Sequence, residues 1–202
     1  MLKELFDIEK IYKLFSYNWS DVFKYIMPTK NKVIESDNEY KSFYYGSILT
    51  GLGLLLYIII STLVNIIIAS NSFYTRLEYG PNAFFSLLGN AIPSMIIQIF
   101  LSLILSGGVY YYSNRFKEKQ QVPIVYFILA IISVLGLIGT VLSLLDWLIK
   151  LFSVFIGSIF GIASSLLLIM GFVHYLVGAI DICTRANSGL EIDKEEIKID
   201  NP

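Results

Sequence analysis

The sequence predicts an all-α protein, a polytopic membrane bundle of about four transmembrane helices with an amphipathic helix at its N-terminus. Hydrophobic residues make up 55% of the 202 residues and charged residues 15%, whereas soluble domains have ~45–50% and ~25%. Apolar stretches recur that are long enough to cross a bilayer, which takes ~20 residues of helix. Lysine and arginine collect on alternate connections between these stretches, as they do in membrane proteins of defined orientation.

Residues 1–27 predict an amphipathic helix that ends before Pro28. Apolar side chains recur every three or four residues, which is the helical period, at Leu5, Ile8, Tyr12, Phe15, Trp19, Val22 and Ile26. Aromatic residues are dense here, and Trp and Tyr favour the headgroup region of a membrane. Two interpretations stay open: the helix lies on the membrane surface, or it docks on the cytoplasmic side of the protein's own bundle. Residues 1–45 then form a cytoplasmic helix and linker, 46–183 the bundle, and 184–202 a disordered acidic cytoplasmic tail.

The first span is expected at about 47–69, followed by a loop at 71–82 with the turn signal Gly80-Pro81. The apolar region 83–112 is too long for one simple span. Because proline suits the first turn of a helix, the second span is placed at 93–112, with 83–88 as a short interfacial or re-entrant piece. Counting that piece gives five spans; the alternative is one long helix kinked at Pro93. The third span is expected at about 122–145.

The fourth span is the stretch Leu151–Ile180, which contains no Asp, Glu, Lys or Arg. Small side chains repeat along one broad face of this predicted helix. They are Ser153, Gly157, Gly161, Ser164, Ser165, Gly171 and Gly178. Because membrane helices associate where small residues let backbones approach closely, this face is predicted to be a packing seam, either for the chain's own helices or for a partner.

The distribution of positive charge predicts that both termini are cytoplasmic. With four spans, 13 of the 15 Lys and Arg residues fall in the N-terminal segment, the loop 113–121 and the tail. The two remaining loops hold only Arg76 and Lys150. The positive-inside rule places the basic side in the cytoplasm, and we expect an integral protein of the cell membrane.

The composition argues against several function classes. A single cysteine, Cys183, and a single histidine, His174, leave no paired ligands for a metal knuckle or a zinc motif. No Asp, Glu, Lys or Arg lies inside a predicted span, whereas ion-coupled carriers usually keep such groups there. With a net charge of −1, we expect no nucleic-acid partner. We also expect no cofactor and no enzymatic activity.

Two sets of polar residues are candidates for ligand contact. His174 and Asp181 lie seven residues apart on one helical face, so the carboxylate could orient the imidazole as a pH-sensitive or ligand-contacting pair. The alternative is a histidine hydrogen-bonded to another helix. Asn65 on the first span and Gln98 on the second belong to polar stripes, which either bond helices together or form a polar pathway.

The order of the parts resembles small multi-pass membrane proteins of the Yip family over roughly Gly46–Cys183. The resemblance rests on the Pro93-led second span, the basic loop 113–121 and the glycine-rich last helix. Such proteins commonly have five spans, and eukaryotic members carry Asp-Leu-Tyr-Gly-Pro before them. Here only Tyr79-Gly80-Pro81 matches, after the first span. The resemblance implies a scaffold or adaptor in membrane organisation that lacks catalytic residues.

The leading functional hypothesis is therefore a non-enzymatic scaffold or adaptor in the lipid bilayer, which binds other membrane proteins, lipid or itself through small-residue helix faces. One alternative is a carrier or channel subunit for a neutral or apolar solute. A further alternative is an immunity protein against a membrane-active toxin, which small size and a lack of catalytic groups permit.

Overall fold

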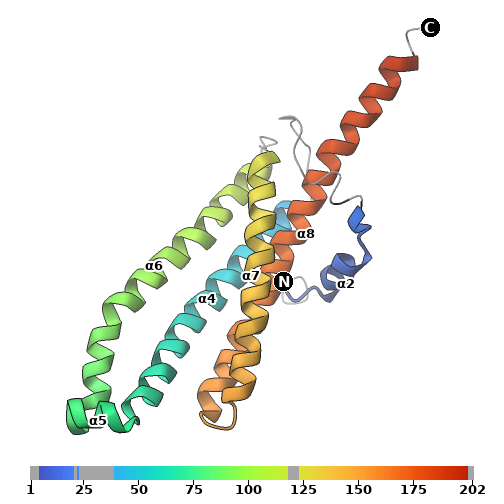
Figure 1. Ribbon diagram of the computed structural model, residues 1–202. Helices are drawn as coiled ribbons and strands as arrows, with labels where there is room; N and C mark the ends of the chain where they lie inside the picture. Colours follow the sequence, from blue (N-terminus) through green and yellow to red (C-terminus); the bar gives the residue numbers. More distant parts are fainter. Residues whose placement is uncertain (1–4, 21, 23–38, 118–122, 200–202) are drawn as a thin grey trace.

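The computed structural model describes residues 5–20, 22, 39–117 and 123–199, and these parts are helical with short connections (Figure 1). The helices are α2 (Ile8–Ser16), α4 (Glu39–Ser70), α5 (Phe73–Tyr79), α6 (Ala83–Lys117), α7 (Pro123–Lys150) and α8 (Phe155–Ile199), with a 3-10 turn η1 (Gly80–Asn82). The described residues include no strand. The predicted all-α fold is confirmed.

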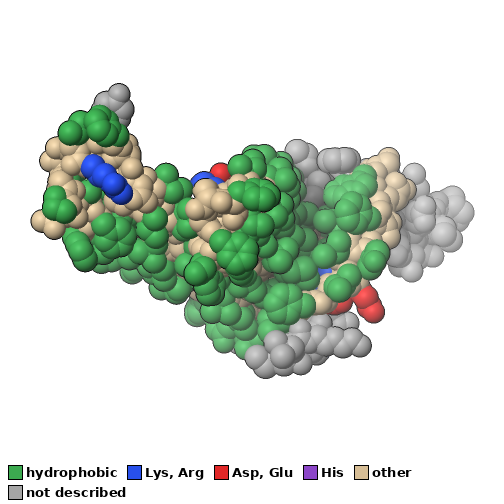
Figure 2. Space-filling view, turned by 90° about the horizontal axis from the view of Figure 1, so that it is seen from below, with side chains coloured by type: hydrophobic (Ala, Val, Ile, Leu, Met, Phe, Trp, Pro, Cys, Tyr) green, Lys and Arg blue, Asp and Glu red, His purple; other side chains and the backbone are tan. Residues whose placement is uncertain are grey.

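Four of these helices are long and apolar enough to cross a membrane. The candidate spans are Tyr40–Ser70, Thr75–Ser113, Ile124–Lys150 and Phe155–Thr184, and they confirm the predicted number of four. Figure 2 looks at the lower end of the molecule, where α5 and the α7–α8 turn lie, and shows a mainly hydrophobic surface with few charged side chains. We call this the hairpin end, and the opposite end, near Tyr40 and Thr184, the terminal end.

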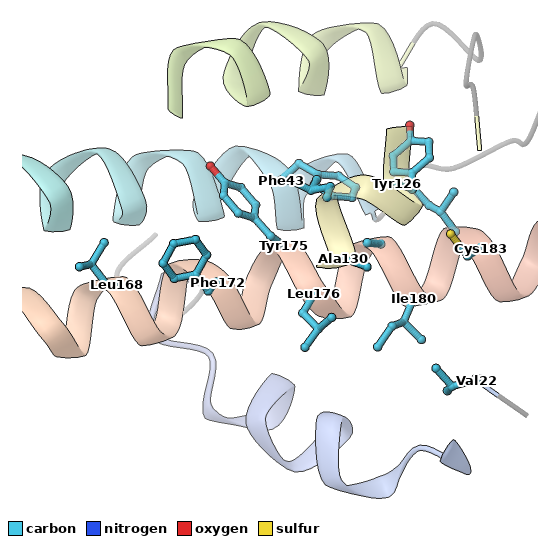
Figure 3. Close-up of a cluster of buried hydrophobic side chains, with 13 residues drawn as sticks. Val22, Phe43, Tyr126, Ala130, Leu168, Phe172, Tyr175, Leu176, Ile180 and Cys183 are labelled. Atoms are coloured by element: carbon cyan, nitrogen blue, oxygen red, sulfur yellow. The ribbon is translucent and has the colours of Figure 1, made fainter. Parts of the chain in front are cut away.

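Helix α8 is the centre of the assembly. It packs against α4 on one side and α7 on another, while α6 packs on α4 (Figure 1). In the most apolar segment of α8, half of the residues are buried, against 11–22% in the corresponding segments of the other three candidate spans. From Met170 to Cys183 every residue except Asp181 is buried. This stretch forms the main core with Phe43 and Tyr126 (Figure 3).

The predicted break at Pro93 is wrong, and the alternative of one continuous helix holds. Helix α6 runs through Pro93 from Ala83 to Lys117, and Figure 1 shows it changing direction in the half nearer α5. A proline inside a helix removes one hydrogen bond and bends the helix, but the apolar residues on both sides of it favour continuation. The predicted loop 71–82 likewise contains α5 and η1.

The last helix differs from its predicted bounds at both ends. Helix α8 begins at Phe155 rather than Leu151, because residues 151–154 form the turn after α7. At the other end the prediction of a disordered tail from 184 does not hold as far as Ile199, where the helix ends. Glu and Lys, which are frequent in this tail, are good helix formers. Of the predicted N-terminal helix 1–27, Ile8–Ser16 forms α2, which ends before Tyr17, where the backbone is extended. Residues 1–4, 21 and 23–27 and most of the linker lie outside the described residues.

Candidate functional site

The small residues of α8 lie against other helices of the same chain. A Cβ built on Gly161 would lie 2.1 Å from Cδ2 of Trp147 on α7. A Cβ on Gly171 would lie 2.6 Å from Cγ2 and 2.9 Å from the backbone nitrogen of Thr50 on α4. Such distances leave no room for a side chain, so the close approach of α4 and α7 to α8 depends on glycine.

Gly157 and Gly178 extend the same contact along α4. A Cβ on Gly157 would meet Cγ2 of Val64 at 2.5 Å, and one on Gly178 would meet Cζ of Phe43 at 3.0 Å. Ser164 and Ser165 are buried and both donate to the carbonyl of Gly161, at 2.7 and 3.0 Å. The seam therefore faces α4 and α7.

Ser153 does not belong to this seam, which corrects the prediction. It lies before α8 in the turn after α7, it is exposed, and its hydroxyl donates to the carbonyl of Lys150 at 3.1 Å. The four-residue spacing that placed Ser153 on the helical face applies only where the chain is helical.

A buried polar network at the α4–α8 contact was not predicted from the sequence. The hydroxyl of Tyr175 lies 2.9 Å from Oγ1 of Thr50 and 3.1 Å from Oγ of Ser47. The Tyr175 ring stacks on Phe43, with 6.5 Å between ring centroids. Because an unsatisfied hydroxyl is costly away from water, this network fixes the register of α4 on α8. Only the helical spacing of Ser47 and Thr50 hinted at it.

His174 and Asp181 share a face of α8 but do not form the predicted pair. His174 is fully buried, and its Nε2 lies 3.0 Å from the carbonyl oxygen of Leu5. Because a carbonyl only accepts, Nε2 carries the hydrogen. Nδ1 is buried without a hydrogen-bond partner among the described residues.

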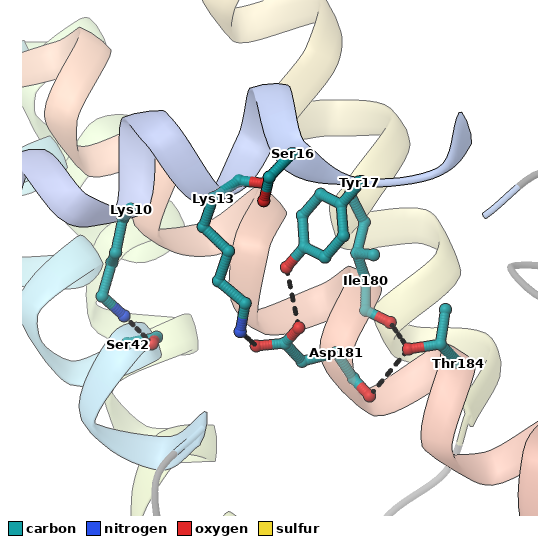
Figure 4. Close-up of polar contacts among 8 residues, drawn as sticks. All are labelled: Lys10, Lys13, Ser16, Tyr17, Ser42, Ile180, Asp181 and Thr184. Atoms are coloured by element: carbon teal, nitrogen blue, oxygen red, sulfur yellow. Dashed lines mark hydrogen bonds and ion pairs between the residues drawn. The ribbon is translucent and has the colours of Figure 1, made fainter. Parts of the chain in front are cut away.

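Asp181 instead holds the N-terminal helix. The ammonium of Lys13 lies 2.5 Å from one carboxylate oxygen, and the hydroxyl of Tyr17 donates to the other at 2.7 Å (Figure 4). The ammonium of Lys10 donates to the Ser42 hydroxyl on α4. Thus α2 docks on the bundle through polar contacts to both α4 and α8. These contacts replace the predicted interaction between His174 and Asp181. Lys13 and Tyr17, which lie more than 150 residues away in the sequence, occupy the carboxylate instead.

A groove of about 440 Å³ lies between α4 and α6, toward the hairpin end. Its polar lining residues are Thr62, Asn65, Asn90 and Ser94, and its apolar ones include Ile66 and Met95. Asn65 and Asn90 are exposed. Gln98 is also exposed and donates only to Ser94 of its own helix, at 3.2 Å. Asn65 and Gln98 therefore do not bond to each other across the helices.

A second cavity, of about 500 Å³, lies at the α4–α5–α6 connection. Arg76 lines it, and its guanidinium is held by the side-chain oxygen of Asn71 at 2.8 Å. The described residues contain no group of three or more His, Cys, Asp or Glu side chains that could hold a metal ion.

Comparison with known proteins adds no relative to this picture: no protein-family model, curated protein or solved structure matches the chain. The functional argument therefore rests on the geometry above.

Proposed function

We propose that the protein is a non-enzymatic integral membrane protein, a scaffold or adaptor that binds a helix of another membrane protein in the groove between α4 and α6. The seam of α8 is not the proposed binding surface, because the chain's own α4 and α7 fill it.

The observation that carries the proposal is the set of exposed amides within the candidate spans. Asn65 and Asn90 have no hydrogen-bond partner in the described part of the chain, and Gln98 has one on its own helix. Hydrocarbon offers polar groups nothing to bond, so an unsatisfied group there costs several kcal/mol. Asn90 lies fifteen residues inside its candidate span, whereas Asn65 lies five residues from the end of its span, at the edge of the hydrocarbon. A partner helix with polar side chains satisfies these amides, and such bonds contribute about 0.6 kcal/mol each on average.

The shape of the surface supports the same occupant. In the described part of the chain, the main contact of α6 with another long helix is the one with α4, and just 11% of the residues in its most apolar segment are buried. A Cβ on Gly89, Gly107 or Gly108 of α6 would meet nothing within 4 Å. None of these glycines lines the groove, so the open space beside them is a separate surface of α6.

Site-specific photocrosslinking in native membranes tests the proposal. A photoreactive residue at Ala91, in the groove, is compared with one at Leu142, an exposed position on α7. We expect one defined protein adduct, identified by mass spectrometry, from Ala91 and none from Leu142. Adducts with lipid alone at both positions would contradict the proposal, and a cross-linked dimer of this chain would show that the partner is a second copy.

The double variant Asn65→Leu and Asn90→Leu should lose that adduct and keep its fold. Both side chains are exposed, so their replacement removes no hydrogen bond within the described part of the chain. We predict an unchanged or higher thermal unfolding temperature in detergent. Loss of the folded protein would instead mean that these amides bond the helices of this chain together.

A further inference from the structure

The N-terminal helix α2 packs part of its apolar side on the bundle, through Ile11 and Leu14, and leaves three large apolar side chains exposed. Its lysines are engaged on the bundle: Lys10 donates to Ser42, and Lys13 pairs with Asp181 (Figure 4). Its outward side carries Ile8, Tyr12 and Phe15, which are 60%, 72% and 79% exposed. Large apolar side chains that stand together on a surface usually mark an interaction site.

The position of α2 along α8 defines its depth. The backbone of Leu5 contacts His174, and Tyr17 contacts Asp181, so the segment runs in the same direction as α8, as Figure 3 also shows. Leu5 packs with Leu49 and Met170. Both partners lie inside the candidate spans Tyr40–Ser70 and Phe155–Thr184.

These positions can be compared with the thickness of a bilayer. The spans of 31 and 30 residues are about 45 Å long, so they exceed a hydrocarbon core of ~30 Å by ~8 Å at each end. Leu49 lies nine residues from Tyr40, about 13 Å of helix. For spans that are centred in the bilayer and cross it without tilt, Leu5 lies deeper than this ~8 Å margin, within the hydrocarbon, and α2 rises from there toward the level of Asp181.

We propose that the outward face of α2, formed by Ile8, Tyr12 and Phe15, is a lipid-binding surface that inserts at the boundary between headgroups and acyl chains. An amphipathic helix at that boundary buries its apolar face ~5–10 Å deep, and tyrosine favours this level because its ring is apolar and its hydroxyl polar. Asp181, Ser42 and the Leu5 carbonyl hold the helix in this pose.

The test uses the full chain in vesicles of phosphatidylcholine and phosphatidylglycerol. A single cysteine at Phe15 or at Tyr12 carries an environment-sensitive fluorophore, and the neighbouring exposed Ser16, labelled in the same way, is the control. The parent chain provides the blank, because Cys183 is buried. We expect a nitroxide near the headgroup end of the lipid chains to quench the labels at Phe15 and Tyr12. Aqueous iodide should quench these two labels less than it quenches the label at Ser16.

Two results would overturn the proposal. Equal iodide quenching at Phe15, Tyr12 and Ser16 would mean that the face points into water. Protection from both quenchers, with energy transfer between labels that increases with the protein-to-lipid ratio, would mean that a second copy covers it. Neither result depends on the groove between α4 and α6, so the scaffold proposal is judged separately.

Discussion

At the scale of single residues, the contact between Gly161 and Trp147 shows how glycine sets the distance between helices. Trp147 is 2% exposed and cannot rotate away freely. The indole also makes an edge contact with Tyr57 of α4, with 6.5 Å between ring centroids. Because Gly161 has no side chain, Trp147 lies close to α8, and this contact sets the position of α7. Trp147 in turn contacts α4 through Tyr57.

Gly161→Ala should destabilise the protein although alanine is the better helix former. The new methyl group overlaps the Trp147 ring, and overpacking of this kind costs about 1–3 kcal/mol. We expect a lower thermal unfolding temperature in detergent. Gly108→Ala is the matched control, because nothing lies within 4 Å of its Cβ, and it should leave the temperature unchanged or raise it. Equal effects of the two variants would contradict this account.

Asp181→Asn should release α2 from the bundle without unfolding the spans. The Asp181 side chain is 16% exposed and that of Lys13 is 47% exposed, so solvent screening limits the loss to about 1 kcal/mol. That loss corresponds to about fivefold faster amide hydrogen exchange in residues 8–16. Asp146→Asn, which removes an exposed pair with Lys150 within α7, should leave the exchange of α2 unchanged. Unaltered exchange in both variants would show that the carboxylate does not hold the helix.

The sequence indicated which α8 residues are small, and hence that backbones approach there, but not which helix approaches each one. It placed His174 and Asp181 on one face correctly. It could not reveal that Leu5 and Lys13 reach them, because contacts across about 170 residues leave no local pattern. The Tyr175 hydroxyl network was missed for the same reason.

At the scale of elements, α6 shows the limit of reading a helix boundary from proline. Pro93 predicted a start, because proline fits a first helical turn, but the helix begins ten residues earlier, at Ala83. Apolar residues precede the proline, and a membrane favours a continuous helix because backbone groups must bond internally. Local propensity gave way to this requirement, and Pro93 lies in the half of α6 in which Figure 1 shows the helix changing direction.

Pro93→Ala should straighten α6 and move its first turns. Alanine restores a backbone donor for the carbonyl of Gly89, and removing a kink of ~20° displaces a point ~15 Å away by about 5 Å. The distance between spin labels at Phe85 and Ile149, both exposed, reports the movement. Pro81→Ala, in η1 outside α6, should leave the distance unchanged. An unaltered distance in Pro93→Ala would mean that packing on α4, not proline, sets the direction of α6.

Of the two interpretations drawn from the N-terminal sequence, the structure shows the docked helix, and contact with the membrane surface remains the proposal made above for its exposed face. Its periodicity predicted an amphipathic helix, and the structure docks its polar contacts on α4 and α8 while the aromatic side remains outside. The pattern could not show which side faces the protein, because that depends on Asp181 and Ser42, which lie in other helices.

At the scale of the whole molecule, four apolar helices with α8 at the centre were predictable from composition and from the spacing of small residues. The arrangement of α6 was not predictable in this way. In the described part of the chain, its main contact with another long helix is the one with α4. Polar stripes were predicted on the first and second spans, and nothing in them indicates which helix stays at the periphery. That asymmetry leaves the amides of the groove exposed.

The central claim is that the four helices cross the membrane and leave the connections at the hairpin end on one side. Labelling of intact cells with an impermeant maleimide tests it, with single cysteines at Leu77 in α5, Ser153 in the α7–α8 turn and Ser188 beyond the last span. We predict labelling at Leu77 and Ser153 in intact cells, and at Ser188 only after the membrane is permeabilised. Labelling of Leu77 and Ser153 from opposite sides, or of all three positions alike, would contradict the four-span bundle built around α8.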